Sequence, residues 1–165
     1  MTSHAELLYA DFTQEHASTR RMLERYPEGK GDWRPHEKSR ALAPLATHVA
    51  DIVNRGTTVL ETDAMDIATR HPLTPIDSAG GLIELFDTSV ARFTAALAAT
   101  TDDALGRPWA IRHGTRVLME HPRRLMLRTI MMSHLVHHRA QLGVYYRLLG
   151  IPVPGVYGPS ADEGA

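Results

Sequence analysis

Hydrophobic residues recur every three or four positions in four stretches of the chain, and this spacing predicts amphipathic helices. The first helix is expected over about residues 4–25, because Ser3 is suited to cap its start and Pro27 ends the pattern. The second helix should begin near Ser39 and continue to about Leu60, with its hydrophobic positions along one side. Each of these two helices therefore has one face suited to a protein core.

The second half of the chain contains the other two predicted helices and a short extended element. A third helix is expected from Ser78, a suitable N-cap, to about Thr100. The stretch Pro108–Met119 has a His-Gly pair between two short β-prone runs, which predicts a small hairpin. The last helix should begin at Pro122 and end before Gly150, which makes it the longest, at about 27 residues.

Polar segments rich in proline and glycine separate or follow these elements. Two long connections, about residues 28–39 and 63–77, show no helical period, and residues 151–165 form an irregular tail. Four helices joined in this way predict an all-α fold, a four-helix bundle with a small β-hairpin before the last helix. A chain of 165 residues suits one domain, which we expect to span residues 1–165.

Composition narrows the classes of function. The chain has 18 lysines and arginines against 19 acidic residues, a net charge of -1, so it lacks the positive surplus that nucleic-acid binding usually requires. It has no run of about 18 apolar residues that could span a bilayer, and its start does not resemble a secretory signal. We therefore expect a cytoplasmic protein with neither a nucleic-acid nor a membrane partner. Because there is no cysteine, any metal must have nitrogen or oxygen ligands.

The last predicted helix carries the clearest chemical signal. His134 and His138 are four positions apart, so they lie on one face of the helix and can bind one ion together. His48 lies on the hydrophobic side of the second predicted helix, with Asp51 and Arg55 beside it. Facing helices of a bundle project side chains into a common interior, where metal sites of this architecture are built. We therefore predict that His48, His134 and His138 bind one divalent transition metal ion per chain.

Other residues near these histidines have more than one interpretation. A pair of histidines four positions apart also occurs by chance, and the three histidines could form a hydrogen-bonded core cluster without metal. Gln141, Tyr145 and Asp51 are candidates for shaping the site, and Gln141 follows His138 by three positions. His137 is turned away from the pair by about 100°, so we expect it beside the site or at the surface.

The opposite side of the last predicted helix has a different character. Arg139 lies there, and we expect it in an ion pair or at a solvated edge. A second apolar strip of mostly small residues could pack against another helix or a second copy of the chain, which favours a homodimer. This strip consists of Met132, Val136, Ala140 and Gly143.

Several segments together resemble one family, the DinB/YfiT-like superfamily, over nearly the whole chain. They are the run Ser133–Pro154, the run Leu45–Ile52, the segment Trp33–Ser39, the pair Pro108–Trp109 and the closing segment Val156–Glu163. The resemblance implies a four-helix bundle that is commonly dimeric, with zinc or nickel held by His48, His134 and His138. Despite its name, the family does not imply a DNA polymerase.

The resemblance also implies two kinds of function. Some members of the superfamily transfer or isomerise small molecules with the help of a low-molecular-weight thiol, so we expect a small-molecule substrate and a metal-dependent thiol transferase or hydrolase. Because the chain has no cysteine, any thiol must come from another molecule. The alternative is a non-catalytic protein in which the metal is structural or sensory. No catalytic residue beyond the three metal ligands can be named from the sequence.

Overall fold

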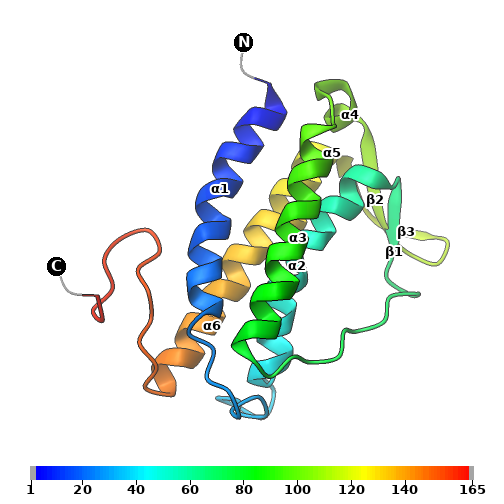
Figure 1. The fold of residues 1–165 in the computed structure, drawn as a ribbon. Coiled ribbons are helices and arrows are strands. Elements are labelled where there is room, and N and C mark those ends of the chain that lie inside the picture. Colours follow the sequence, from blue (N-terminus) through cyan, green and yellow to red (C-terminus); the bar gives the residue numbers. More distant parts are fainter. Residues whose placement is uncertain (1–2, 164–165) are drawn as a thin grey trace.

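The computed structural model describes residues 3–163 and is mostly helical (Figure 1). Its long α-helices are α1 (His4–Leu23), α2 (Leu42–Glu61), α3 (Ala79–Ala98) and α6 (His134–Leu148). The shorter helices are α4 (Asp102–Gly106), α5 (Arg123–Met126) and the π-helix η1 (Leu127–Ser133). The strands are β1 (Ala64–Asp66), β2 (Pro108–His113) and β3 (Arg116–Pro122).

The long helices lie side by side, and the small sheet lies against one end of them (Figure 1). Both α1 and α2 contact α3, and both also contact α6. Helix α2 is buried along most of its length, from Leu42 to Val59. Aliphatic and aromatic side chains from all four long helices pack together in the core. A polar residue on the inner side of α2 or α6 therefore lies close to the neighbouring helix.

The starts of α1 and α3 follow the sequence prediction closely. The Ser3 hydroxyl accepts a hydrogen bond from the Glu6 amide at 3.1 Å, and the Glu6 carboxylate accepts one from the Ser3 amide at 2.7 Å. This reciprocal pair is a capping box. At the start of α3, the Ser78 hydroxyl accepts from the Gly81 amide at 3.3 Å. Both serines thus satisfy backbone amides that have no partner inside the helix.

Helix α2 begins at Leu42, three residues later than the sequence predicted. Ser39 lies in the preceding loop and does not cap the helix. Instead, the Leu42 amide donates to the Trp33 carbonyl and the Ala43 amide donates to the Gly31 carbonyl, both at 2.9 Å. The loop backbone therefore supplies the acceptors that a capping side chain would otherwise supply. A cap formed by residues this far back in the chain leaves no local sequence signal.

The last predicted helix is helical along its whole length but is not one α-helix. Pro122 precedes it, and α5, η1 and α6 follow one another without interruption. In η1 the amides bond to carbonyls five residues earlier instead of four, which is the π-helical pattern. Gly150, with φ of +72°, ends α6 in the left-handed conformation that glycine adopts easily. The hydrophobic pattern did not indicate the π-helix.

The structure is mostly helical, as predicted, but residues 3–163 include a three-stranded sheet where only a two-stranded hairpin was expected. The predicted hairpin is present as the antiparallel pair β2 and β3. Strand β1, which pairs in parallel with β2, was not predicted. The buried Arg123 side chain donates to the Thr62 carbonyl and the Asp63 carboxylate, both at 2.8 Å, and so fixes the chain just before β1. A strand of three residues is too short to show an alternating pattern.

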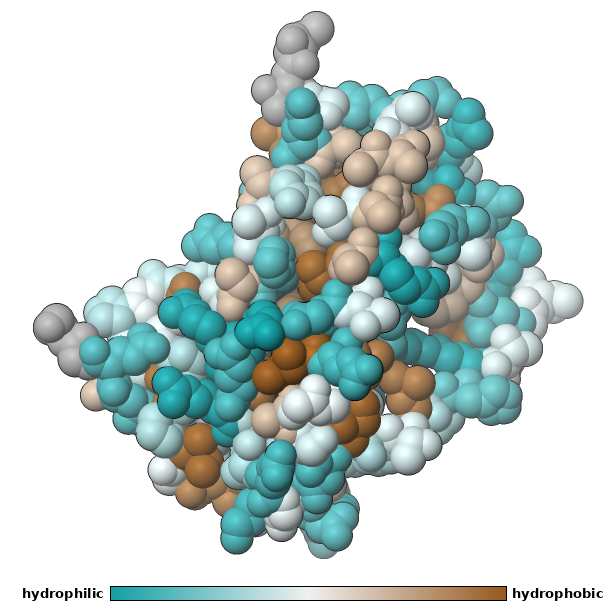
Figure 2. Space-filling model, in the orientation of Figure 1, coloured by the Kyte–Doolittle hydropathy of each residue, from teal (hydrophilic) through white to brown (hydrophobic). Residues whose placement is uncertain are grey.

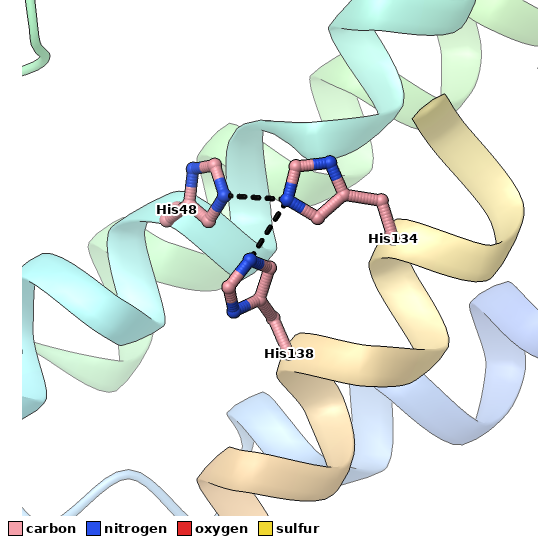
Figure 3. A group of neighbouring side chains, drawn as sticks. All are labelled: His48, His134 and His138. Carbon is pink, nitrogen blue, oxygen red and sulfur yellow. Dashed lines mark hydrogen bonds between the residues drawn. The ribbon is translucent and has the colours of Figure 1, made fainter. Parts of the chain in front are cut away.

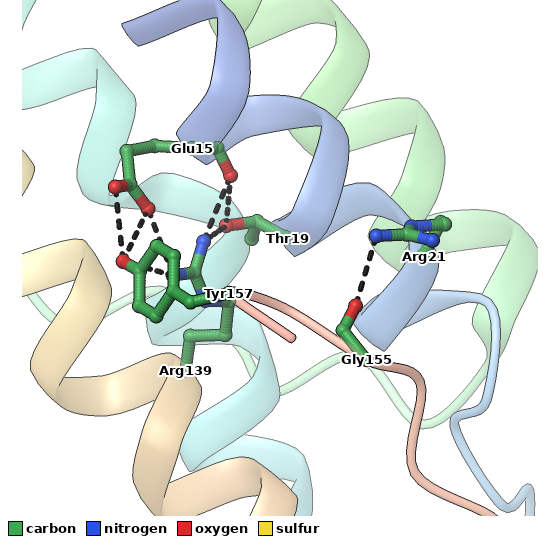
Figure 4. A network of polar contacts seen from close by, with 6 residues as sticks. All are labelled: Glu15, Thr19, Arg21, Arg139, Gly155 and Tyr157. Atoms are coloured by element: carbon green, nitrogen blue, oxygen red, sulfur yellow. Dashed lines mark hydrogen bonds and ion pairs between the residues drawn. The ribbon is translucent and has the colours of Figure 1, made fainter. Parts of the chain in front are cut away.

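The tail has no helix or strand from residue 151 to residue 163, as predicted, and side chains anchor it to α1 and α6 (Figure 4). Arg139 is only 2% exposed, so the expectation that it lies at a solvated edge is wrong. The alternative expectation, an ion pair, is confirmed. Its guanidinium lies 2.8 Å from the Glu15 carboxylate and donates to the Tyr157 hydroxyl at 2.7 Å. Tyr157 in turn donates to Glu15. Three segments distant in sequence therefore share one polar network.

The apolar strip, which runs from Met132 of η1 to Gly143 of α6, is partly covered by the chain itself. Met132 is buried in the core. Gly143 faces Met22 of α1 and Val153 of the tail. A Cβ atom added at Gly143 would lie 3.5 Å from Met22 and 3.7 Å from Val153, in van der Waals contact with both. The homodimer therefore stays a prediction.

The molecular face seen in Figure 2 is mostly hydrophilic, with hydrophobic side chains exposed in separate patches. No helix in residues 3–163 is both long enough and apolar enough to span a membrane.

Candidate metal centre

The structure brings His48, His134 and His138 together between α2 and α6 (Figure 3). The Nε2 atom of His134 lies 3.2 Å from Nε2 of His48 and 2.8 Å from Nε2 of His138. One ring nitrogen from each histidine lies within 4.8 Å of the other two. All three side chains thus point at one small volume, as their helical positions predicted.

Local helix geometry explains this convergence. His134 and His138 are separated by one turn of α6, so their imidazoles lie one above the other. His48 lies near the middle of α2, on the side that packs against α6. The three rings contact one another mostly edge to face, with the centroids of His48 and His138 4.6 Å apart. All three rings are thus carried by helices.

The surroundings keep the histidines neutral at physiological pH. Burial, followed by the nearby charge of Arg55, lowers the pKa of His48 to about 3. The same two causes lower the pKa of His134 to about 4. Burial also lowers the pKa of His138. Neutral imidazoles have a free lone pair, which is the form that binds a metal ion.

These lowered pKa values predict an acid dependence of stability in metal-free protein. Between about pH 6.5 and pH 4 the unfolded chain takes up protons on His48 and His134, whereas the folded chain does not. The unfolding free energy should therefore fall as the pH decreases through this window, by on the order of 2 kcal/mol after allowance for partial exposure. Urea denaturation of chelator-treated protein at pH 7.5 and pH 4.5 measures the loss. A His48→Gln variant should show a smaller loss, and an unchanged loss would contradict the assignment.

The three nitrogen donors fit a divalent transition metal ion. Their ring nitrogens lie within 4.8 Å of one another and could hold one ion, and zinc–nitrogen bonds are usually about 2.0–2.1 Å long. Imidazole suits zinc, nickel, copper and iron, and three such ligands leave coordination positions for other molecules. In a purely hydrogen-bonded cluster, Nε2 of His134 has at most one hydrogen to share between Nε2 of His48 and Nε2 of His138, whereas a metal ion binds the lone pairs of all three rings. The three histidines are therefore positioned to hold a metal ion, whose identity stays a prediction.

The other residues considered from the sequence have different surroundings. The Gln141 side-chain oxygen lies 2.7 Å from Nδ1 of His138, so it can orient this ring as expected. Asp51 lies in the wall of the adjacent cavity. Tyr145 donates to the Arg40 carbonyl at 3.1 Å and so fixes the loop before α2. His137 is exposed and lies outside the group of three.

A cavity of about 510 Å³ adjoins the histidines on the side of His48, and its role was not predicted. Arg55 lies in its wall, with its Nη1 atom 3.2 Å from Nδ1 of His134. Burial, followed by the charge of Arg70, lowers the pKa of Arg55 to about 10, so the guanidinium remains charged at neutral pH. The sequence placed Arg55 beside His48 but assigned it no function. Arg55 follows His48 by seven positions, about two helical turns, so the two residues lie on the same side of α2. This spacing was the signal in the sequence that Arg55 could lie near the site.

Comparisons with known proteins agree with this fold. A family model described as the DinB family matches residues 1–165. The structure is similar to a DinB-like protein from Bacillus cereus, with a TM-score of 0.70, 23% identity, and coverage of 91% of this chain and 95% of that chain. It is also similar to a DinB-like protein from Bacillus subtilis, with a TM-score of 0.68, 21% identity, and coverage of 87% and 92%.

A comparison with curated proteins found no match. At the identities of the two solved structures, the structural likeness supports the fold alone. The family match is independent of that likeness and covers the whole sequence, including the three converging histidines. The chain therefore belongs to the DinB family.

Proposed function

We propose that this protein is a metal-dependent enzyme that acts on a small molecule, with one zinc or nickel ion held by His48, His134 and His138. The observation that carries the proposal is the cavity of about 510 Å³ that reaches His48. A structural zinc site is usually closed by four protein ligands, whereas a catalytic site keeps a position open. Three ligands beside a cavity of small-molecule size fit the catalytic kind.

We also infer that the four long helices form a four-helix bundle around this site. The support is their pattern of contacts, in which α1 and α2 each pack against both α3 and α6. In such a ring, side chains from adjacent helices meet in the interior. The ligands come from the adjacent helices α2 and α6, so the bundle itself would position them.

The first candidate reaction is the transfer of a low-molecular-weight thiol to an electrophilic small molecule. A bound divalent ion would supply Lewis acidity and lower the pKa of a coordinated thiol or water. In the transfer, the thiol gives up its proton and its sulfur forms a bond to the electrophilic carbon. The leaving group departs with the electron pair of the broken bond and takes up a proton. Hydrolysis would use the same site, with water in place of the thiol.

The residues of the chain have limited tasks in this proposal. The three histidines bind the ion in neutral form, and Gln141 orients the His138 ring. The cavity wall surrounds the small molecule. Because the chain has no cysteine, the thiol is a separate substrate and no covalent thiol intermediate with the protein is needed. The alternative is a structural or sensory metal, which would stabilise the fold without accepting an outside ligand.

Cobalt(II) substitution distinguishes an open site from a closed one. We expect 2-mercaptoethanol to produce a sulfur-to-cobalt charge-transfer band in the cobalt-loaded protein, because three protein ligands leave a position for the thiol. Absorption spectroscopy measures the band, and cobalt-free protein is the control. If cobalt binds and raises the melting temperature but the thiol leaves the spectrum unchanged, the non-catalytic alternative is favoured and the thiol-transfer proposal is wrong.

A further inference from the structure

The cavity beside the three histidines has a positive charge surplus. It lies between α2 and the connection that follows β1, and its wall includes Arg40, Arg55 and Arg70. The single carboxylate in the wall is that of Asp51. Three arginines against one aspartate leave a formal surplus of two positive charges, in a chain whose net charge is -1. This surplus is therefore local to the cavity.

The one carboxylate in the wall is already engaged. One Asp51 oxygen accepts a hydrogen bond from Nη2 of Arg70 at 3.1 Å, and the other accepts from the Asn54 amide at 3.0 Å. Asp51 therefore compensates the charge of Arg70. Within residues 3–163, neither Arg40 nor Arg55 forms an ion pair with a carboxylate. Two guanidinium groups of the wall are thus available to an anion from outside.

Arg55 is the more constrained of these two arginines. Its Nε atom is buried and has no hydrogen-bond partner among the residues that the structure describes. Its Nη1 atom lies 3.2 Å from Nδ1 of His134. When Nε2 of a neutral histidine binds a metal, Nδ1 carries the hydrogen and cannot accept one from arginine. Arg55 would then have two donors without an acceptor, which is unfavourable for a partly buried group.

We propose that this cavity binds a carboxylate group of the small-molecule substrate through Arg55 and Arg40. The proposal rests on the proposed function, in which the reacting end of the same molecule lies at the three histidines. A guanidinium group matches a carboxylate with two parallel hydrogen bonds. Because the guanidinium of Arg70 already compensates Asp51, the charge that an outside group meets in this wall is that of Arg40 and Arg55. The volume of about 510 Å³ is sufficient for a small organic acid.

Two pairs of matched probes test the role of charge. Isothermal titration calorimetry at pH 7 compares 3-mercaptopropionate with 2-mercaptoethanol on the zinc-loaded protein. Propionate and propionamide, which have no thiol, are titrated in parallel. We expect each carboxylate to bind roughly tenfold more tightly than its neutral partner, as for a hydrogen bond to a charged group.

Variants of the cavity wall show whether the arginines cause this preference. Arg40→Gln and Arg55→Gln should each reduce the preference, and the double variant should bring the two members of each pair close to equal affinity. Arg92→Gln is the matched control, because Arg92 is exposed on α3 and does not line the cavity. Metal content is measured for every variant, since Arg55 contacts a predicted metal ligand.

The outcomes separate this proposal from the proposed function. Equal affinities within each pair for the unmodified protein would overturn the carboxylate site. A preference that survives in the Arg40→Gln/Arg55→Gln double variant would also overturn it. Loss of metal or thiol binding together with an intact preference for propionate over propionamide would overturn thiol transfer and support the carboxylate site.

Discussion

Protein purified without a histidine tag is expected to contain roughly one zinc or nickel ion per chain, and the His48→Ala and His134→Ala variants are expected to lose it. Each variant removes one of three nitrogen donors that lie within 4.8 Å of one another. Changes that merely disturb the orientation of a ligand weaken binding about 10- to 100-fold, so removal of a ligand should weaken it by on the order of 100-fold or more. Elemental analysis by mass spectrometry measures the metal content.

A neighbouring histidine supplies the matched control. His137 is exposed, and its ring lies 4.8 Å from the His138 ring without belonging to the group of three. The His137→Ala variant should therefore keep its metal. Full metal content in His48→Ala would show that the ligand set is wrong. Absence of metal from the unmodified protein, even after reconstitution with zinc and nickel, would contradict the metal centre itself.

The Arg139→Met variant should lose about 3 kcal/mol of unfolding free energy, because it leaves the Glu15 carboxylate without its buried partner. The guanidinium also donates to the Glu15 carbonyl at 3.0 Å and to the Thr19 hydroxyl at 3.2 Å. Its loss therefore removes contacts between α6 and α1 as well as the contact with Tyr157 of the tail. Urea denaturation followed by circular dichroism measures the change.

A second substitution shows whether unpaired charge causes this loss. In the Arg139→Met/Glu15→Gln double variant no charge is left unpaired, so part of the stability should return. Arg128→Met, which changes an exposed arginine of η1, should alter stability by less than about 0.5 kcal/mol. Metal content should stay unchanged in all three variants. An equal loss in the single and double variants would show that packing, and not charge, explains the role of Arg139.

The part of the site that depends on helical spacing could be predicted from the sequence. His134 and His138 are four positions apart, and any regular helix places them on one face. His48 lies on the hydrophobic side of its helix. Because that side packs in the core, the His48 side chain faces a neighbouring helix. The same reasoning predicted the contact of Gln141 with His138. In each case one period, that of the α-helix, determined the direction of the side chain.

The features that escaped prediction depend on contacts between distant segments. The late start of α2 follows from backbone acceptors at Gly31 and Trp33, far outside the usual capping positions. Strand β1 exists because β2 lies beside it and Arg123 holds the chain before it. Arg55 reaches His134 only because α2 packs against α6. Short-range patterns contain no information on such contacts.

The π-helix η1 ends directly before His134, and this position affects how relatives of the chain should be compared. A π-helical turn holds about one residue more than an α-helical turn, and one residue corresponds to a rotation of about 100°. A relative with an uninterrupted α-helix would therefore need one residue fewer between Pro122 and the histidine pair to direct both rings toward α2. Alignments of such relatives should place a single-residue gap inside Leu127–Ser133, where a gap inside a helix would otherwise look like an error.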